Sequence, residues 1–280
     1  MIALVPDPFF LSDPVFQMNP LLDLSFRPVI GHRGNRAQAP ENTIESFAQA
    51  VAAGADAIEF DVRVTADGVP VVCHDPSVTR TTDGTGEIER MTFAELRRLD
   101  AGARFTPDGG KSFPYRGLAH RIPSAEEVIE AFPNTPLLIE IKTPSASAAL
   151  RRALESKHAE ERTVVDSLDG EALRVYADSS IALGASRSDV ARVMAEVLLH
   201  LPLTPFAFRA LCVPLEFYGL PIPVRRFARV APSQNCALHV WTINDPAVAT
   251  GLWRDGVRGI ITDDPALMLR ARASLPKALP

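Results

Sequence analysis

The chain has 280 residues, of which 46% are hydrophobic and 22% are charged, and its formal net charge is -5. This composition is ordinary for a water-soluble globular enzyme and excludes the collagenous, strongly disordered and membrane-spanning classes. The negative charge, with no long run of Lys and Arg to offset it, argues against a nucleic-acid partner. The length allows one large domain, because barrels of roughly 250 residues fold as one unit.

The N-terminal stretch 1–27 is apolar, but it lacks a basic start and carries three aspartates, so we interpret it as mature chain rather than as a signal peptide. Its prolines forbid a long helix. We expect an irregular N-terminal arm that lies on the main domain or on a neighbouring subunit, which leaves a homodimer as an open alternative. No segment of the sequence reaches the roughly 18 uncharged apolar residues of a membrane span.

The cysteines Cys73, Cys212 and Cys236 are widely spaced, with neither a CxxC pair nor the density of a disulfide-rich protein. This usage fits a reducing compartment. We therefore expect a cytoplasmic location.

From residue 28 onward, short apolar runs alternate with longer amphipathic stretches, which is typical of repeated βα units. Strands are predicted at 28–31, 57–62, 70–73, 137–141, 163–166, 181–184, 210–213, 238–242 and 259–262. The turn 65–68 is too short for a parallel crossover, and its Asp-Gly pair suits a β-hairpin. Without the returning hairpin strand, eight parallel strands remain, the number that closes a barrel. We predict an α/β fold, a (β/α)8 TIM barrel over residues 28–280.

Helices are predicted at 43–53, 124–131, 145–158, 170–177 and 188–199, with a short one near 92–99. Ser124 followed by Glu127 forms a capping box at the start of one of them. Residues 76–123 are too many for an ordinary βα connection, so we expect a small insertion, beside the hairpin, over the C-terminal mouth of the barrel. The proline-rich segment 201–227 allows no prediction.

The functional face of such a barrel is built from the C-terminal ends of its strands, where this sequence places several carboxylates. Glu59 and Asp61 lie two residues apart in an apolar strand and so share one face. Neighbouring buried carboxylates need compensation, and Glu140 would add a third hard oxygen ligand. The pattern favours one divalent cation, Mg²⁺ or Ca²⁺. The alternative is a buried ion network in which Arg33 and Lys142 neutralise the carboxylates.

His32 and His74 also fall at the predicted mouth, and two histidines can supply the base and the acid of stepwise phosphodiester cleavage. Arg33 and Lys142 could bind phosphate oxygens. Trp241 could wall a substrate pocket, although a tryptophan in a strand is more often core. No function is assigned to the remaining histidines, which are His120, His158, His200 and His239.

Two acidic residues, Asp263 and Asp264, follow the last predicted strand. They could belong to the mouth. We expect them instead to cap the helix that follows.

These residues stand in motifs that resemble the glycerophosphodiester phosphodiesterase family. The matching stretches are GHRG at 31–34, the run from APENT at 39 to HD at 75, RTTDGTG at 80–86, LLIEIK at 137–142, VWTIN at 240–244 and GIITDDP at 259–265. The match is dense in the first half of the chain and sparse over 143–236. One departure is Pro123-Ser124-Ala125, where the family commonly has Pro-Thr-Leu.

The resemblance implies a TIM barrel that hydrolyses glycerophosphodiesters to sn-glycerol 3-phosphate and an alcohol. It implies a divalent cation bound by Glu59, Asp61 and Glu140, acid and base roles for His32 and His74, and phosphate contacts from Arg33 and Lys142. By the same analogy, the glycerol 2-hydroxyl, polarised by the metal, attacks phosphorus, and water opens the resulting cyclic phosphate. Hydrogen-bonding roles for Glu41 and Asn42 are suggested more loosely.

Two other functions stay open at this point. One is a lysophospholipase D-type activity on lysophospholipids, which the apolar segments 1–26 and 198–227 would favour by docking an acyl chain. The other is a non-catalytic barrel that binds a phosphorylated ligand. The presence of both histidines and all three carboxylates argues against the second.

Overall fold

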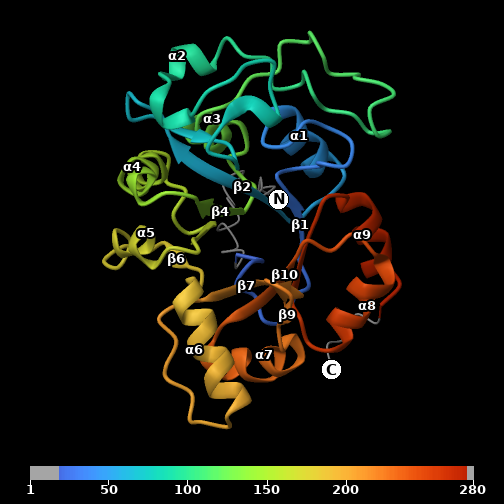
Figure 1. The fold of residues 1–280 in the computed structure, drawn as a ribbon. Helices are drawn as coiled ribbons and strands as arrows, with labels where there is room; N and C mark the ends of the chain where they lie inside the picture. The colour runs from blue at the N-terminus through green and yellow to red at the C-terminus, as the bar shows by residue number, and fades with distance from the viewer. Residues whose placement is uncertain (1–18, 276–280) are drawn as a thin grey trace, which may run out of the picture.

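The computed structural model describes residues 19–275 and shows a barrel of parallel strands inside a ring of helices (Figure 1). The parallel strands follow the order β6-β5-β4-β2-β1-β11-β10-β7, and a bridge between Gly184 and Ala210 joins the two ends. Their bounds are β1 Val29–His32, β2 Ala57–Val64, β4 Leu137–Ile141, β5 Thr163–Asp166, β6 Ala182–Leu183, β7 Ala210–Pro214, β10 Ala237–Trp241 and β11 Gly259–Thr262. The predicted (β/α)8 TIM barrel is confirmed.

The helices on the outside are α1 Ile44–Ala52, α3 Ala125–Ala131, α4 Ser147–Ser156, α5 Gly170–Arg174, α6 Arg187–Leu198, α7 Val224–Val230, α8 Pro246–Arg254 and α9 Pro265–Ala273. Each predicted helix is present, and Ser124 forms its capping box with Glu127 as expected. The bounds of α7, α8 and α9 were not predicted from the sequence.

The predicted hairpin is present: β3, Pro70–Val72, pairs antiparallel with β2. After it the chain forms the short helices η1 Val78–Arg80, η2 Ile88–Arg90 and α2 Phe93–Leu96 at the top of Figure 1. Their apolar side chains, among them Val78, Ile88 and Leu96, pack with Val71 in a core of their own. A second hairpin, β8 Glu216–Phe217 with β9 Leu220–Pro221, follows β7 in the segment that allowed no prediction.

Alternation along each strand separates the inside of the barrel from its helix-covered outside. On β2, Ile58 and Phe60 belong to the outer apolar core, whereas Ala57 belongs to the cluster in the lumen. Glu59 and Asp61 share the face of Ala57 and therefore point inward. The lumen is apolar at its N-terminal end and carries carboxylates at its C-terminal end.

The N-terminal end of the lumen is closed by Leu21, a fully buried residue of the predicted arm. Leu21 packs with the first inward residues of several strands, among them Ile30 and Ala57. Its carbonyl oxygen lies 2.9 Å from Nε2 of the buried His239. Residues 1–18 of the predicted arm lie outside the described residues.

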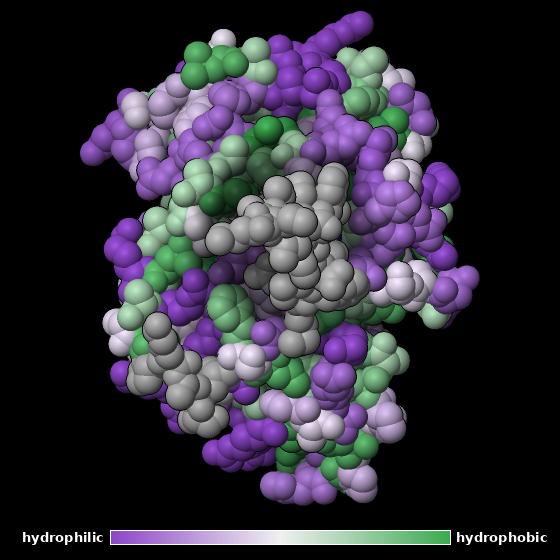
Figure 2. Space-filling model, turned by 180° about the vertical axis from the view of Figure 1, so that it is seen from behind, coloured by the Kyte–Doolittle hydropathy of each residue, from purple (hydrophilic) through white to green (hydrophobic). Residues whose placement is uncertain are grey.

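Figure 2 shows the molecule from behind relative to Figure 1. On that side, hydrophilic and hydrophobic residues are mixed across the surface. Within residues 19–275, the helices are all too short or too polar to cross a membrane.

Candidate active site

The C-terminal mouth of the barrel holds a cavity of about 290 Å³. Its lining residues are His32, Arg33, Arg36, Glu59, His74, Leu138, Glu140, Lys142, Asp166, Leu168, Cys212, Trp241, Thr242 and Ile261. The structure thus brings together seven of the eight residues predicted for the site. The eighth, Asp61, is 1% exposed and lies beneath Arg33 and Lys142, which contact it.

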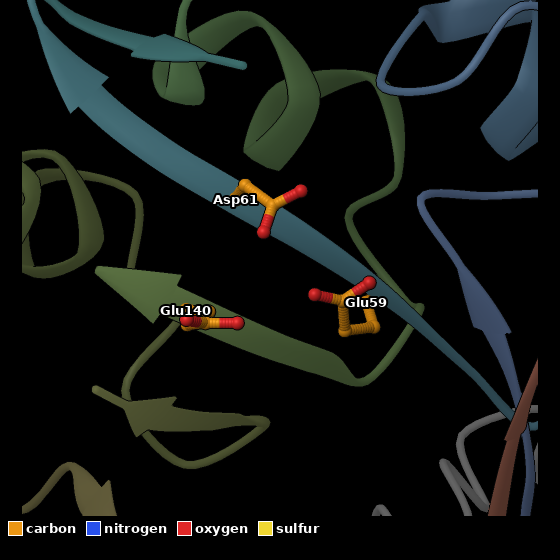
Figure 3. A group of neighbouring side chains, drawn as sticks. All are labelled: Glu59, Asp61 and Glu140. Carbon is orange, nitrogen blue, oxygen red and sulfur yellow. The ribbon is translucent and has the colours of Figure 1, made fainter. Parts of the chain in front are cut away.

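Three carboxylates from two neighbouring strands face one another in this mouth (Figure 3). Glu59 and Asp61 extend from β2 and Glu140 from β4, where Glu140 pairs in register with Asp61. One ligand oxygen of each lies within 4.8 Å of the others. This arrangement offers hard oxygen donors to a divalent cation.

Two cations contact this group. Lys142 Nζ lies 2.9 Å from Asp61 Oδ1 and 2.7 Å from Glu140 Oε1. Arg33 Nε lies 3.1 Å from Asp61 Oδ2, while its NH1 donates to Glu41 at 2.7 Å. The ion network that the sequence left as an alternative is therefore present. It is incomplete, because Glu59 forms no salt bridge within the described residues and accepts only the backbone N–H of Arg33.

The charges in the mouth leave room for a divalent cation. The three carboxylates face two close cations, Lys142 and Arg33, which leaves an excess of one negative charge, and Arg33 is shared with Glu41. Burial and the charge of Asp61 raise the pKa of Glu59. Burial alone would also raise the pKa of Asp61, but Lys142 and Arg33 hold it below its usual value. The residues present fit a metal with hard oxygen ligands.

Each histidine of the mouth is held by a carboxylate through the same ring nitrogen. His32 Nδ1 lies 2.7 Å from Asp263 Oδ1, and His74 Nδ1 lies 2.7 Å from Asp75 Oδ1. A carboxylate at Nδ1 favours the tautomer that carries its proton there, which leaves Nε2 as the acceptor. Burial lowers the pKa of His74, so the neutral form is favoured.

The expectation for Asp263 was wrong. Asp264 caps α9 by accepting the N–H of Leu267, whereas Asp263 binds His32 and accepts Asn244 Nδ2 at 2.9 Å. Side chains alternate between the two faces of a strand, so Asp263 points to the same side as Ile261, two residues earlier, which lines the cavity. This alternation could have placed Asp263 in the mouth from the sequence.

Glu41 connects the mouth to the insertion. It binds Arg33, Arg36 and Arg80, and these cations hold its pKa well below the usual range against the opposing effect of burial. Arg80 also pairs with Asp75, the partner of His74. Asn42 donates to Asp61 at 2.9 Å. The polar contacts that the resemblance suggested for Glu41 and Asn42 are therefore present.

Asp166, at the end of β5, was not predicted from the sequence as a site residue. It pairs in register with Glu140, lines the cavity and accepts the N–H of Ser167 at 2.9 Å. Burial, with a contribution from the charge of Glu140, raises its pKa to about 7. The same alternation could have indicated this position, because Asp166 lies on the same inward face of its strand as Val164.

The family model described as the glycerophosphoryl diester phosphodiesterase family matches residues 32–267. A glycerophosphodiester phosphodiesterase of Caldanaerobacter subterraneus subsp. tengcongensis is 32% identical over 248 residues, which covers 86% of this chain and 96% of the relative. The chain belongs to this family.

Solved structures of family members have the same fold as this chain. A phosphodiesterase of Oleispira antarctica, solved in complex with the product sn-glycerol-3-phosphate, has 28% identity and a TM-score of 0.72, over 89% of this chain and 98% of that one. The glycerophosphodiester phosphodiesterase of Thermotoga maritima has 26% identity and a TM-score of 0.66, over 87% and 97%. The family match begins at His32 and extends past Asp263, so it includes every residue of the mouth described above.

Proposed function

We propose that this phosphoric diester hydrolase is a metal-dependent glycerophosphodiester phosphodiesterase that releases sn-glycerol 3-phosphate and an alcohol. One observation carries the proposal: three carboxylates, with one ligand oxygen of each within 4.8 Å of the others, and two carboxylate-bound imidazoles lie at or just beneath a single cavity.

Glu59, Asp61 and Glu140 would hold one divalent cation, Mg²⁺ or Ca²⁺. When bound, that cation would balance their charge and make a substrate hydroxyl more acidic.

The two histidines divide the proton transfers. One accepts the proton of the glycerol 2-hydroxyl as its oxygen attacks phosphorus, and the other protonates the oxygen of the departing alcohol. Water then opens the five-membered cyclic phosphate at the bond to the 2-oxygen, with the two roles reversed, and leaves sn-glycerol 3-phosphate. Arg33 and Lys142, which line the cavity, bind the phosphoryl oxygens and stabilise the charge that develops on them.

A coupled assay for sn-glycerol 3-phosphate, supplied with glycerophosphocholine, tests this function. We expect product at a rate proportional to enzyme, and loss of that product when His74 is replaced by Ala. Release of phosphocholine instead would place the cleaved bond on the other side of phosphorus and contradict the proposal.

A lysophospholipase D-type activity is the second candidate, and the hairpin that follows β7 favours it. Tyr218 is 87% exposed and Leu220 66%, on the face where the strands end. Such side chains could contact an acyl chain. Turnover of lysophosphatidylcholine above that of glycerophosphocholine would support this reading. A non-catalytic phosphoester-binding barrel would bind both and cleave neither.

Two further proposals rest on sequence alone. The cysteine usage favours a cytoplasmic location. The apolar N-terminal stretch leaves a homodimer open, which sedimentation of the full chain would test.

A further inference from the structure

The wall of the cavity that faces the catalytic residues contains a carboxylate with no cationic partner. Asp166 accepts hydrogen bonds from the N–H of Ser167 and from the thiol of Cys212, which are both neutral donors. It forms no salt bridge within residues 19–275. By contrast, Asp61 and Glu140 share Lys142, and Asp263 contacts Arg36 as well as His32.

The neighbouring strand is shaped to admit this carboxylate. A Cβ atom at Gly184 would overlap the carboxylate of Asp166, so only glycine leaves the space that it fills. Cys212, on the next strand, is buried, and burial raises the pKa of its thiol well above the usual value, which keeps it a donor. Asp166 is therefore fixed against the wall by its neighbours, with its edge on the cavity.

The position of Asp166 around the barrel indicates what it binds. The inward residues run from His32 on β1 through Glu59 on β2 and Glu140 on β4 to Asp166 on β5, where Glu140 and Asp166 are direct partners in the sheet. If the phosphate lies at Arg33 and Lys142, a glycerol that extends past Glu140 places its terminal carbon beside Asp166. A carboxylate there, ionised above its pKa of about 7, would accept a charge-assisted hydrogen bond from a hydroxyl.

We infer that Asp166 binds the free C1 hydroxyl of the glycerol and thereby selects deacylated glycerophosphodiesters over lysophospholipids. This inference rests on the proposed function, because it takes the orientation of the glycerol from it. A site built to accept a hydrogen bond from a substrate hydroxyl discriminates strongly against an analogue that lacks the hydroxyl, since its own polar group is then left unpaired. In a lysophospholipid the C1 oxygen is acylated and has no proton to donate.

The test pairs one protein change with one substrate change. The variant is Asp166→Asn, which keeps an oxygen for the N–H of Ser167 but loses the charge. The substrates are glycerophosphocholine and 2-hydroxypropyl phosphocholine, which lacks only the C1 hydroxyl. We expect the native enzyme to prefer the glycerol compound by roughly 10- to 100-fold in kcat/KM, and the variant to lose most of that preference.

Further substrates separate this assignment from other uses of the carboxylate. The alcohol of glycerophosphoglycerol is neutral, and the Asp166→Asn variant should lose as much activity on this substrate as on glycerophosphocholine. The preference of the enzyme for glycerophosphocholine over lysophosphatidylcholine should also fall in the variant. A loss confined to the choline compound would mean that Asp166 binds the ammonium group and would overturn the inference. An unchanged preference between the two choline substrates would overturn it as well.

A matched control and a binding measurement complete the design. Asp169→Asn removes an exposed carboxylate three residues away, which caps α5, and should change neither preference. Calorimetry compares the binding of sn-glycerol 3-phosphate with that of 2-hydroxypropyl phosphate in both proteins, and the same loss of preference is expected. If the native enzyme hydrolyses no diester, the proposed function fails, while this binding ratio still supports or overturns the role of Asp166.

Discussion

The two ends of the barrel lumen each bury a histidine, and the two imidazoles have opposite surroundings. At the C-terminal end, His32 is bound at Nδ1 by the carboxylate of Asp263 and lines a polar cavity. At the N-terminal end, His239 is bound at Nε2 by the carbonyl of Leu21 among apolar side chains. A carboxylate stabilises an imidazolium that forms during a reaction, whereas burial in an apolar layer favours the neutral ring.

This difference indicates that the two ends of the lumen have different roles, one in chemistry and one in stability. The C-terminal end gathers carboxylates that a bound cation would balance and basic side chains that a bound phosphodiester would balance. The N-terminal end pairs Nε2 of its buried histidine with a main-chain oxygen and contributes to stability. Changes at the first end should reduce turnover with little effect on unfolding, and changes at the second should do the reverse.

The largest effect is expected from replacement of His32 or His74 by Ala. General acid–base catalysis by one group contributes roughly 100- to 10,000-fold, so we expect kcat on glycerophosphocholine to fall by about 1,000-fold in each variant. The midpoint temperature of thermal unfolding should change by only a few degrees. His158→Asn, at an exposed histidine remote from the mouth, is the control.

A better leaving group distinguishes the two histidines. A glycerophosphodiester of 4-nitrophenol needs little protonation as it departs, so the variant that lacks the general acid should recover most of its rate. Equal losses of both variants on both substrates would contradict the division into acid and base.

The next effect concerns Asp263, whose contact with His32 we interpret as positioning. Asp263→Asn keeps the shape but removes the charge that stabilises the imidazolium. We expect kcat to fall roughly 100-fold with little change in KM. The pH dependence of kcat should also shift. Asp264→Asn is a matched control, because asparagine caps a helix as well as aspartate does. Equal activity of the two variants would remove Asp263 from the site.

At the other end of the lumen, Leu21→Ala should weaken folding rather than chemistry. Leu21 is fully buried, and truncation of a buried leucine costs about 3 kcal/mol. Denaturant titration measures this loss. Turnover per folded molecule should stay near that of the native enzyme, and a large fall in kcat would show that the two ends are coupled.

The smallest effect is a pH dependence of stability due to His239. Burial lowers its pKa to about 4 from the usual 6.5, so the folded protein keeps it neutral while the unfolded chain takes up a proton. Stability is thus lost as pH falls from 6.5 toward 4, by about 2 kcal/mol at pH 5. His239→Gln, which retains an N–H for the Leu21 carbonyl, should lose this part of the dependence. An unchanged pH profile in that variant would contradict the assignment.

The parts of the structure that sequence predicted are those where local patterns decide the outcome. The strands showed as apolar runs, and Glu59, Asp61 and Glu140 stood out because carboxylates are rare in such runs. Asp263 was assigned to a helix cap because it follows a strand, where that is the usual role for an acidic residue. Asp166 was missed because it is the last residue of its strand and, unlike Glu59 and Asp61, has no second carboxylate two residues away. Only closure of the barrel brings Asp263 to His32 and Asp166 to the wall of the cavity.

The central claim, a divalent cation at Glu59, Asp61 and Glu140, is tested most directly by metal removal and return. Formation of sn-glycerol 3-phosphate from glycerophosphocholine would be measured after exhaustive chelation and again after addition of Mg²⁺ or Ca²⁺. We expect activity to disappear and then return with one of these ions, and Glu59→Gln to respond to neither. Full activity in the chelated native enzyme would contradict the claim.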